Sequence, residues 1–252
     1  MKKIVLTIIS SLFFLNFYGN NIKALEDSAL NNYTNKNYEH ALYFYDSISK
    51  LDYSSAELHF NLANCYFNLG NIAEAIYNYE KANILAPNDK DIATNLNIAR
   101  KSVRTKVEPR TEVFYAKWFN SILNLYNSNT WLYISIINFV ISLIMIGLYF
   151  FTTKLMLRKT GFYLGILLLL TSIASLSFSK LQANKILNNK FAIVFETTVV
   201  KSSPSDEGTN LFEISEGMKI EVKDKLQDWS EIKLEDGKEG WLKTESIKHL
   251  QL

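Results

Sequence analysis

The chain has 252 residues, a formal charge of +2 and a mean hydropathy of −0.01. These averages hide four unlike segments: residues 1–24 carry +3, residues 25–112 carry −3, residues 113–190 carry +7, and residues 191–252 carry −5. The third segment contains no acidic residue, which excludes one uniform globular domain, where acids and bases are interspersed. Both acidic segments would repel phosphate, so nucleic acid is not expected as a partner.

The N-terminus has the features of a secretory signal peptide, which we predict over residues 1–24. Lys2 and Lys3 form a basic start, and an apolar run follows them. Gly19 and Ala24 are small residues at which cleavage could occur, but neither stands in a good small-x-small site. The sequence is therefore consistent with a cleaved signal and with an uncleaved anchor.

A helical repeat occupies the predicted domain over residues 25–104, and its best copy covers residues 56–89. Eight residues of this copy fall at the positions that define a tetratricopeptide repeat. These repeat-defining residues are Leu62, Ala63, Tyr66, Gly70, Ala75, Tyr79, Ala82 and Pro87. Small residues let two helices approach closely, a glycine marks the turn, and the proline ends the second helix. The departures are His59, which stands where this family usually has a large aromatic residue, and Ala63, which stands where it often has glycine.

Incomplete copies flank the best repeat. In the preceding 34 residues the second-helix pattern recurs at Tyr38, Ala41 and Tyr45, whereas the first helix is degraded. Residues 90–104 match a first helix only, which gives about two and a half repeats. Solenoids usually need three or more repeats to bury their faces. We therefore expect the third helix and the segment 113–126, or else a partner, to cap the stack.

The first helices of such repeats line a groove that holds a partner segment. The residues predicted to line or border it are Phe60, Asn61, Asn64, Phe67, Asn68 and Asn95. Asparagine amides can donate and accept hydrogen bonds along a bound peptide backbone. The alternative interpretation is that the chain is simply rich in asparagine. Glu26 and Asp91 occupy positions that are basic in carboxylate-binding repeats, so capture of a C-terminal acid is not expected.

Residues 105–130 are expected to form a linker and an amphipathic helix. Phe114, Trp118, Ile122 and Leu125 recur at helical spacing there. Such a helix either lies in the headgroup region of a membrane or packs under the preceding domain.

Two apolar runs, residues 131–151 and residues 161–179, are uncharged and long enough to cross a bilayer as helices. The connection over residues 152–160 is basic, which favours the cytoplasmic side, but Lys180, Lys185 and Lys190 follow the second run, so these charges alone are not decisive. A signal that keeps Lys2 and Lys3 inside predicts the same topology. We therefore expect a multi-pass protein of the inner (cytoplasmic) membrane with both folded domains on the periplasmic side.

After a predicted linker over residues 180–190, residues 191–250 change to short β-type runs separated by turn signals. Several features of this segment resemble, in order and spacing, a bacterial SH3-like domain, which implies a small all-β barrel. These are Gly217 before a strand, Trp229 opening the next strand, a hairpin at Asp236-Gly237, and Gly240-Trp241-Leu242.

The two tryptophans of this segment are either core residues or part of a ligand surface. We expect Trp241 in the core, because the preceding glycine fits tight packing, and Trp229 is the candidate for a ligand surface. Extracytoplasmic SH3-like domains often bind peptide or cell-wall glycopeptide. The resemblance therefore implies peptidoglycan as one ligand of this domain.

The predicted fold class is multidomain: all-α tetratricopeptide repeats, two transmembrane helices and a small all-β SH3-like barrel. This order resembles the repeat-containing member of the Bacteroides aerotolerance (Bat) family, and FYAKWFNSILNLYNSNTW and RKTGFYLGILLLL resemble the family's membrane-proximal segments. The resemblance implies partnership with other Bat proteins, including membrane proteins with von Willebrand A domains. It also implies a role in oxygen or envelope-stress tolerance.

No catalytic constellation stands out in the sequence. There is no G-x-S-x-G motif, no phosphate-binding glycine loop and no histidine pair at metal spacing. The single cysteine, Cys65, is expected to be a small buried apolar residue. We expect no enzymatic activity, no metal and no cofactor. The expected function is a membrane-anchored scaffold, and the alternative is a peptidoglycan-binding sensor or anchor.

Overall fold

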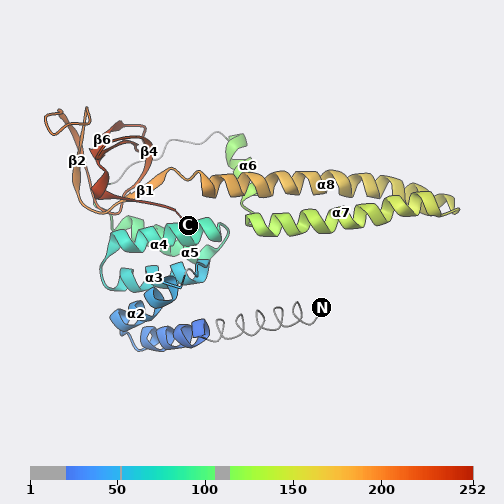
Figure 1. The fold of residues 1–252 in the computed structure, drawn as a ribbon, viewed down its shortest axis with the longest axis horizontal. Coiled ribbons are helices and arrows are strands. Elements are labelled where there is room, and N and C mark those ends of the chain that lie inside the picture. Colours follow the sequence, from blue (N-terminus) through green and yellow to red (C-terminus); the bar gives the residue numbers. More distant parts are fainter. Residues whose placement is uncertain (1–20, 52, 106–113, 252) are drawn as a thin grey trace, which may run out of the picture.

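The computed structural model describes residues 21–51, 53–105 and 114–251. Figure 1 shows a stack of helices, a sheet that lies on one end of this stack, and a long hairpin of two helices. The stack and the sheet lie at the same end of the hairpin (Figure 1). The signal peptide predicted over residues 1–24 lies outside the described residues except for 21–24, which are helical.

The stack consists of two helix pairs and one further helix. Residues 21–34 are helical and pair with α2 (Tyr38–Ser49). Next, α3 (Ala56–Asn68) pairs with α4 (Ile72–Leu85), and α5 (Lys90–Lys101) follows. This arrangement confirms the helical repeats, with one first helix at the end of the stack.

Local signals place the boundaries of these helices. The Ser55 hydroxyl accepts a hydrogen bond from the backbone N–H of Leu58 at 3.0 Å and caps α3. The Asp89 carboxylate accepts from the backbone N–H of Ile92 and caps α5 in the same way. Gly70 has a φ of +82° in the turn between α3 and α4, a conformation that other residues adopt only at a cost.

The first helix of the first repeat forms although its repeat pattern is degraded. Its apolar residues are Ile22, Leu25, Ala29 and Tyr33, spaced three or four apart. They pack in one cluster with Ala41, Tyr45 and Ile48 of α2 and with Leu62 of α3. An amphipathic stripe is enough to bury a helix, and the repeat-defining residues are not needed here.

The hairpin consists of α7 (Ser128–Phe151) and α8 (Leu155–Leu187), both long and apolar enough to cross a membrane. Only 11% of the most apolar window of α7 and 22% of that of α8 are buried. The core helix of a soluble protein would be mostly buried, whereas these helices expose large apolar side chains along their length. This exposure is consistent with helices that span a membrane.

Helix α8 is longer than the span predicted over residues 161–179. Most of the predicted loop over residues 152–160 is helical, so the connection shortens to residues 152–154. Most of the linker predicted over residues 180–190 is also helical. The predictions followed the charges, which end an apolar run but do not end a helix, because lysine and arginine are good helix formers.

Small polar residues spaced seven apart hold the two helices of the hairpin together. The pairs are Ser128 with Ser179, Ser135 with Ser172, and Ser142 with Gly165. In the central pair the Ser135 hydroxyl donates to the Ser172 carbonyl at 2.9 Å, and the Ser172 hydroxyl donates back to the Ser135 carbonyl at 2.9 Å. Seven-residue spacing keeps one face of each helix toward its partner, and small side chains allow close approach.

Seven strands form one antiparallel sheet in the order β3-β2-β6-β5-β4-β1-β7. They are β1 (Phe191–Val194), β2 (Thr198–Lys201), β3 (Asn210–Ile214), β4 (Lys219–Leu226), β5 (Trp229–Lys233), β6 (Glu239–Lys243) and β7 (Ile247–His249). The sheet is consistent with an SH3-like β domain. It is not closed, because β3 and β7 are its edges, whereas the sequence predicts a barrel.

Trp241 does not lie in the core of the sheet, which corrects the prediction made for it. In β6 the buried residues are Gly240 and Leu242, and Trp241 is half-buried on the other face. A Cβ at Gly240 would come within 2.5 Å of the Val200 side chain. The glycine itself makes the close contact, and it does not place the neighbouring tryptophan inside.

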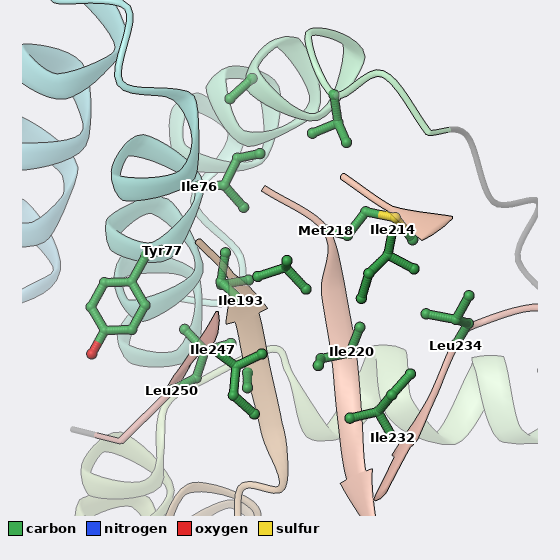
Figure 2. Close-up of a cluster of buried hydrophobic side chains, with 14 of the residues drawn as sticks. Ile76, Tyr77, Ile193, Ile214, Met218, Ile220, Ile232, Leu234, Ile247 and Leu250 are labelled. Atoms are coloured by element: carbon green, nitrogen blue, oxygen red, sulfur yellow. The ribbon is translucent and has the colours of Figure 1, made fainter. Parts of the chain in front are cut away.

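One hydrophobic core runs through the last repeat and the sheet. Figure 2 shows Ile76 and Tyr77 of α4 beside Ile193 of β1 and Met218, which precedes β4. Gly217 has a φ of +81°, and a Cβ there would lie 3.1 Å from the Ile76 side chain. The chain's own sheet therefore covers the end of the stack, where the sequence predicts a cap formed by the third helix with the segment 113–126 or by a partner.

Helix α6 (Phe114–Leu123) packs on the hairpin. The Gln182 side-chain amide donates to the Leu123 carbonyl at 2.8 Å, and the Trp131 indole N–H donates to the same oxygen at 3.0 Å. Large aromatic side chains of α6, including Phe114 and Trp118, stay exposed. The segment also contacts the preceding domain just after this helix, where the Asn88 side-chain amide donates to the Leu125 carbonyl at 2.7 Å.

The close packing of the hairpin can be tested at two glycines. A Cβ at Gly161 would lie 2.6 Å from the Met145 carbonyl oxygen, whereas a Cβ at Gly147 would meet nothing within 4 Å. We expect Gly161→Ala to lower the free energy of unfolding by about 1–3 kcal/mol through overpacking. Gly147→Ala should leave it unchanged or raise it, because alanine favours helix. Thermal unfolding of the full chain in detergent micelles measures both, and equal midpoints would contradict the close packing.

Candidate protein-binding groove

Polar side chains from three successive first helices meet along the stack. The Tyr79 hydroxyl donates to the Asn64 side-chain oxygen at 2.5 Å, and the Asn95 amide donates to the same oxygen at 3.4 Å. The Asn68 amide lies 3.4 Å from the Tyr33 hydroxyl. These five residues, which we call the amide ladder, join the helix of residues 21–34 to α3 and α5. The structure thus brings together three of the predicted groove residues.

The amide ladder has the chemistry to bind a peptide backbone. The Asn64 oxygen is occupied by two donors, which leaves its amide N–H groups to donate outward. The Asn95 oxygen can accept in turn. Phe60 lies beside the ladder, with its ring centroid 5.9 Å from that of Tyr79, and it is only partly buried. Neutral amides and an aromatic edge suit an extended segment of mixed polarity.

Two predicted groove residues lie elsewhere. Asn61 lines a separate depression of about 150 Å³ together with Glu26, Glu57 and Tyr45. Phe67 packs partly buried against the shared core. Both residues share α3 with the ladder, but no hydrogen bond of the described residues joins them to it. Sequence analysis missed Tyr33, because the repeat pattern of its helix is degraded, although its apolar spacing could have indicated it.

The repeat-defining residues are mostly buried, as their role requires. Buried members are Leu62, Ala63, Ala75, Tyr79 and Ala82. Tyr66 is half-buried, Gly70 stands in the turn, and Pro87 follows the end of α4. Cys65 is also fully buried, and burial together with the Asp46 charge raises the pKa of its thiol to about 12. A protonated, enclosed thiol is unreactive.

His59 fills the position where the repeat family usually has a large aromatic residue. It is buried, and its Nδ1 lies 3.1 Å from the Asn78 side-chain oxygen while its Nε2 lies 3.0 Å from the Ser54 hydroxyl. Burial lowers the pKa of His59 to about 4, against the smaller opposing effect of the Asn78 hydrogen bond. The imidazole is therefore neutral at pH 7 and bridges α3 to α4.

The outer face of the sheet carries both tryptophans. Trp229 stands opposite Lys243 and Trp241 opposite Glu231 in the β5–β6 pairing. Both rings are half-buried, and the Lys243 ammonium lies 5.9 Å from the Trp229 ring centroid. Trp229 is thus placed where a ligand could reach it, and Trp241 joins it there.

A buried carboxylate connects the stack to the sheet. Glu80 of α4 has a side chain that is 1% exposed, and it pairs with Arg100 of α5 and with Lys219 of β4, the latter at 2.7 Å. Burial alone would raise the pKa of Glu80, but the two cations outweigh it and hold the pKa below its ordinary value. The carboxylate therefore stays charged and fixes the sheet on the stack of repeat helices.

Residues 56–89 match the family model of the tetratricopeptide repeat. These are the same 34 residues that the sequence pattern indicates. The chain has no significant match among curated proteins. Among the described residues, no group of three or more histidine, cysteine, aspartate or glutamate side chains could hold a metal ion. Tetratricopeptide repeats are surfaces for protein partners in general, which makes the amide ladder the leading candidate site.

The Glu80 ion pairs can be tested against a second ion pair of the same helix. Glu80→Gln leaves two cations facing a neutral amide in a buried site, and we expect it to lower the free energy of unfolding by about 3 kcal/mol. Glu74 also reaches the sheet, through Lys248 at 3.5 Å, but Lys248 is exposed and Glu74 is only partly buried. Glu74→Gln should cost less than about 1 kcal/mol. Thermal unfolding at neutral pH measures both, and equal losses would contradict a special role for Glu80.

The buried histidine makes stability depend on pH. The pKa of His59 is about 4 in the folded chain and 6.5 when unperturbed, so between these values the unfolded chain binds the extra proton. Stability is therefore complete above pH 6.5 and falls by about 2–3 kcal/mol as the pH drops to 4. His59→Gln should flatten this slope, whereas His40→Gln, at an exposed position, should not. Unfolding midpoints measured between pH 4 and pH 6.5 test this prediction. If stability falls as steeply with pH in His59→Gln as in the wild-type chain, the pH dependence does not come from His59.

Proposed function

We propose that this chain is a membrane-anchored scaffold that holds a segment of a partner protein in its repeat groove. The amide ladder carries the proposal: amides from successive first helices lie in one row, with donors and acceptors left for a partner. The opposite side of α4 is already covered by the chain's own sheet. The scaffold acts by binding and performs no catalysis.

The antiparallel hairpin supports this arrangement in a membrane. Its two helices begin and end at the same side, so the repeats and the sheet share one side of the bilayer (Figure 1). The basic turn with Lys154, Arg158 and Lys159 lies at the other end. A signal that keeps Lys2 and Lys3 inside makes that turn cytoplasmic and both folded parts periplasmic.

The segment order supports a place among Bat proteins, with BatE as the member that the chain resembles. In that setting the groove holds a segment of another membrane protein, for which von Willebrand A-domain Bat proteins are the first candidates. The complex would then serve tolerance of oxygen or envelope stress.

Crosslinking and pull-down from native membranes test the groove directly. We expect Asn95→Lys to reduce recovery of the partner at least tenfold, because it puts a charge and extra bulk into the amide ladder. Asn97→Lys is the matched control, since Asn97 lies on the same helix, is exposed and is not part of the ladder. Equal recovery with both variants would overturn the groove as the binding site.

A second candidate function is binding of peptidoglycan by the sheet. The shared exposed face of Trp229 and Trp241 favours it, because aromatic rings can stack on sugars. Sedimentation of the solubilised full chain with purified sacculi separates the two functions. Sedimentation that Trp229→Ala abolishes would support this candidate, and its absence in the wild-type chain would exclude it.

A further inference from the structure

A cavity of about 670 Å³ lies where the four parts of the protein meet. Its lining includes Ile84 of α4, Phe119 of α6, Leu181 of α8 and Phe191 of β1. Figure 1 shows that α4, α6 and β1 lie at the end of the hairpin that carries the folded parts. The volume is that of a typical small-ligand site.

The walls of this cavity are fixed by buried hydrogen bonds. Gln182 is 5% exposed, and its amide donates to the Leu123 carbonyl at 2.8 Å and to the Tyr126 carbonyl at 3.1 Å. These bonds hold α6 against α8. On the other side, the Val222 N–H donates to the Lys190 carbonyl at 2.7 Å and joins the end of the hairpin to the sheet. The cavity is therefore built from folded elements on both sides.

The cavity is positively charged. Three lysines line it, and its only acidic lining residue is Glu221, which pairs with Lys223 at 3.1 Å. Lys219 is engaged by Glu80. Lys185 donates to the neutral Asn120 side chain at 3.0 Å, and in the described part of the chain neither it nor Lys190 has an acidic partner. Two cations are thus left to meet an anion.

The same cavity has an apolar side that continues into the membrane surface of the protein. Phe119 and Leu181 are both lining residues and both exposed. Beyond them lie the exposed aromatic side chains of α6 and the apolar flank of α8. The last residue of the apolar run is Ser179; Lys185 follows it by about two helical turns, and Lys190 lies just past the end of α8 at Leu187. In an inserted hairpin this is the level of the lipid headgroups.

We propose that this cavity binds an anionic phospholipid. Lys185 and Lys190 contact the phosphate, the asparagine amides donate to the remaining headgroup oxygens, and the acyl chains lie along α6 and α8. A soluble anion would use only the polar half of the site, whereas a phospholipid uses both halves. The inference rests on the membrane insertion proposed above. The positive-inside rule does not explain why lysines also stand on the side of the folded parts; lipid binding explains Lys185 and Lys190. The bound lipid then connects the hairpin to the folded parts.

Lipid retention by the full chain tests this proposal. The chain is reconstituted in nanodiscs of phosphatidylcholine with or without phosphatidylglycerol, and bound lipids are counted by native mass spectrometry. We expect the wild-type chain to retain phosphatidylglycerol in preference to phosphatidylcholine. Because each lysine near an anionic lipid is worth about a fivefold change in binding, Lys185→Gln with Lys190→Gln should lower this preference by roughly tenfold or more.

The matched control is Lys36→Gln with Lys50→Gln, which removes the same charge at exposed positions of the first repeat. An equal loss in both double variants would overturn the site, as would no loss in either. Hydrogen exchange of the wild-type chain gives a second measurement, because phosphatidylglycerol should protect residues 117–126 and 180–190. If glycerol 1-phosphate protects these residues equally well, the ligand of the cavity is a soluble phosphate and the lipid proposal is wrong.

Membrane insertion is checked first, by extraction with alkaline carbonate. Release of the wild-type chain would refute the anchoring in the proposed function and this inference with it. An inserted chain that shows no preference for phosphatidylglycerol would overturn the lipid site alone and leave the scaffold untouched.

Discussion

A single buried carboxylate determines how the folded parts of this protein are joined. Glu80 takes Arg100 from the last helix of the stack and Lys219 from the sheet, and all three elements surround one hydrophobic core. A charge enclosed to this degree is stable only while its partners stay in place. The sheet therefore cannot leave the stack without exposing both the core and an unpaired charge. Repeats and sheet behave as one body, and the groove is one of its surfaces.

This dependence also explains how two and a half repeats form a stable stack. A solenoid exposes an apolar face at each end, and terminal units normally need a polar outer face. Here the second helix of the third repeat is absent from the pattern, and the face that it would cover is occupied by Gly217, Met218 and the first strand of the sheet. The cap is covalently part of the chain, so it is always present at high local concentration.

The hairpin uses a different kind of bond for its own assembly. In lipid, apolar contact between helices adds little, and small polar residues supply close packing and hydrogen bonds. The serine pairs at seven-residue spacing provide both. Gln182 then continues the polar contacts beyond the apolar run and fixes α6. The hairpin, α6, the stack and the sheet thereby line a cavity at one end of the hairpin.

The sequence by itself determined which structural parts the chain contains. The offsets of residues 56–89 identified the repeat, the uncharged runs identified the hairpin, and alternation with glycine turns identified the sheet, since each pattern reflects the period of one local structure. The tertiary structure decided how these parts contact one another. It placed Trp241 outside the core, gave the degraded first helix its role through Tyr33, and put the sheet where a partner was expected. These outcomes depend on contacts between residues far apart in the sequence, from 35 positions for Tyr33 and Asn68 to 139 for Glu80 and Lys219, and no local period records such contacts.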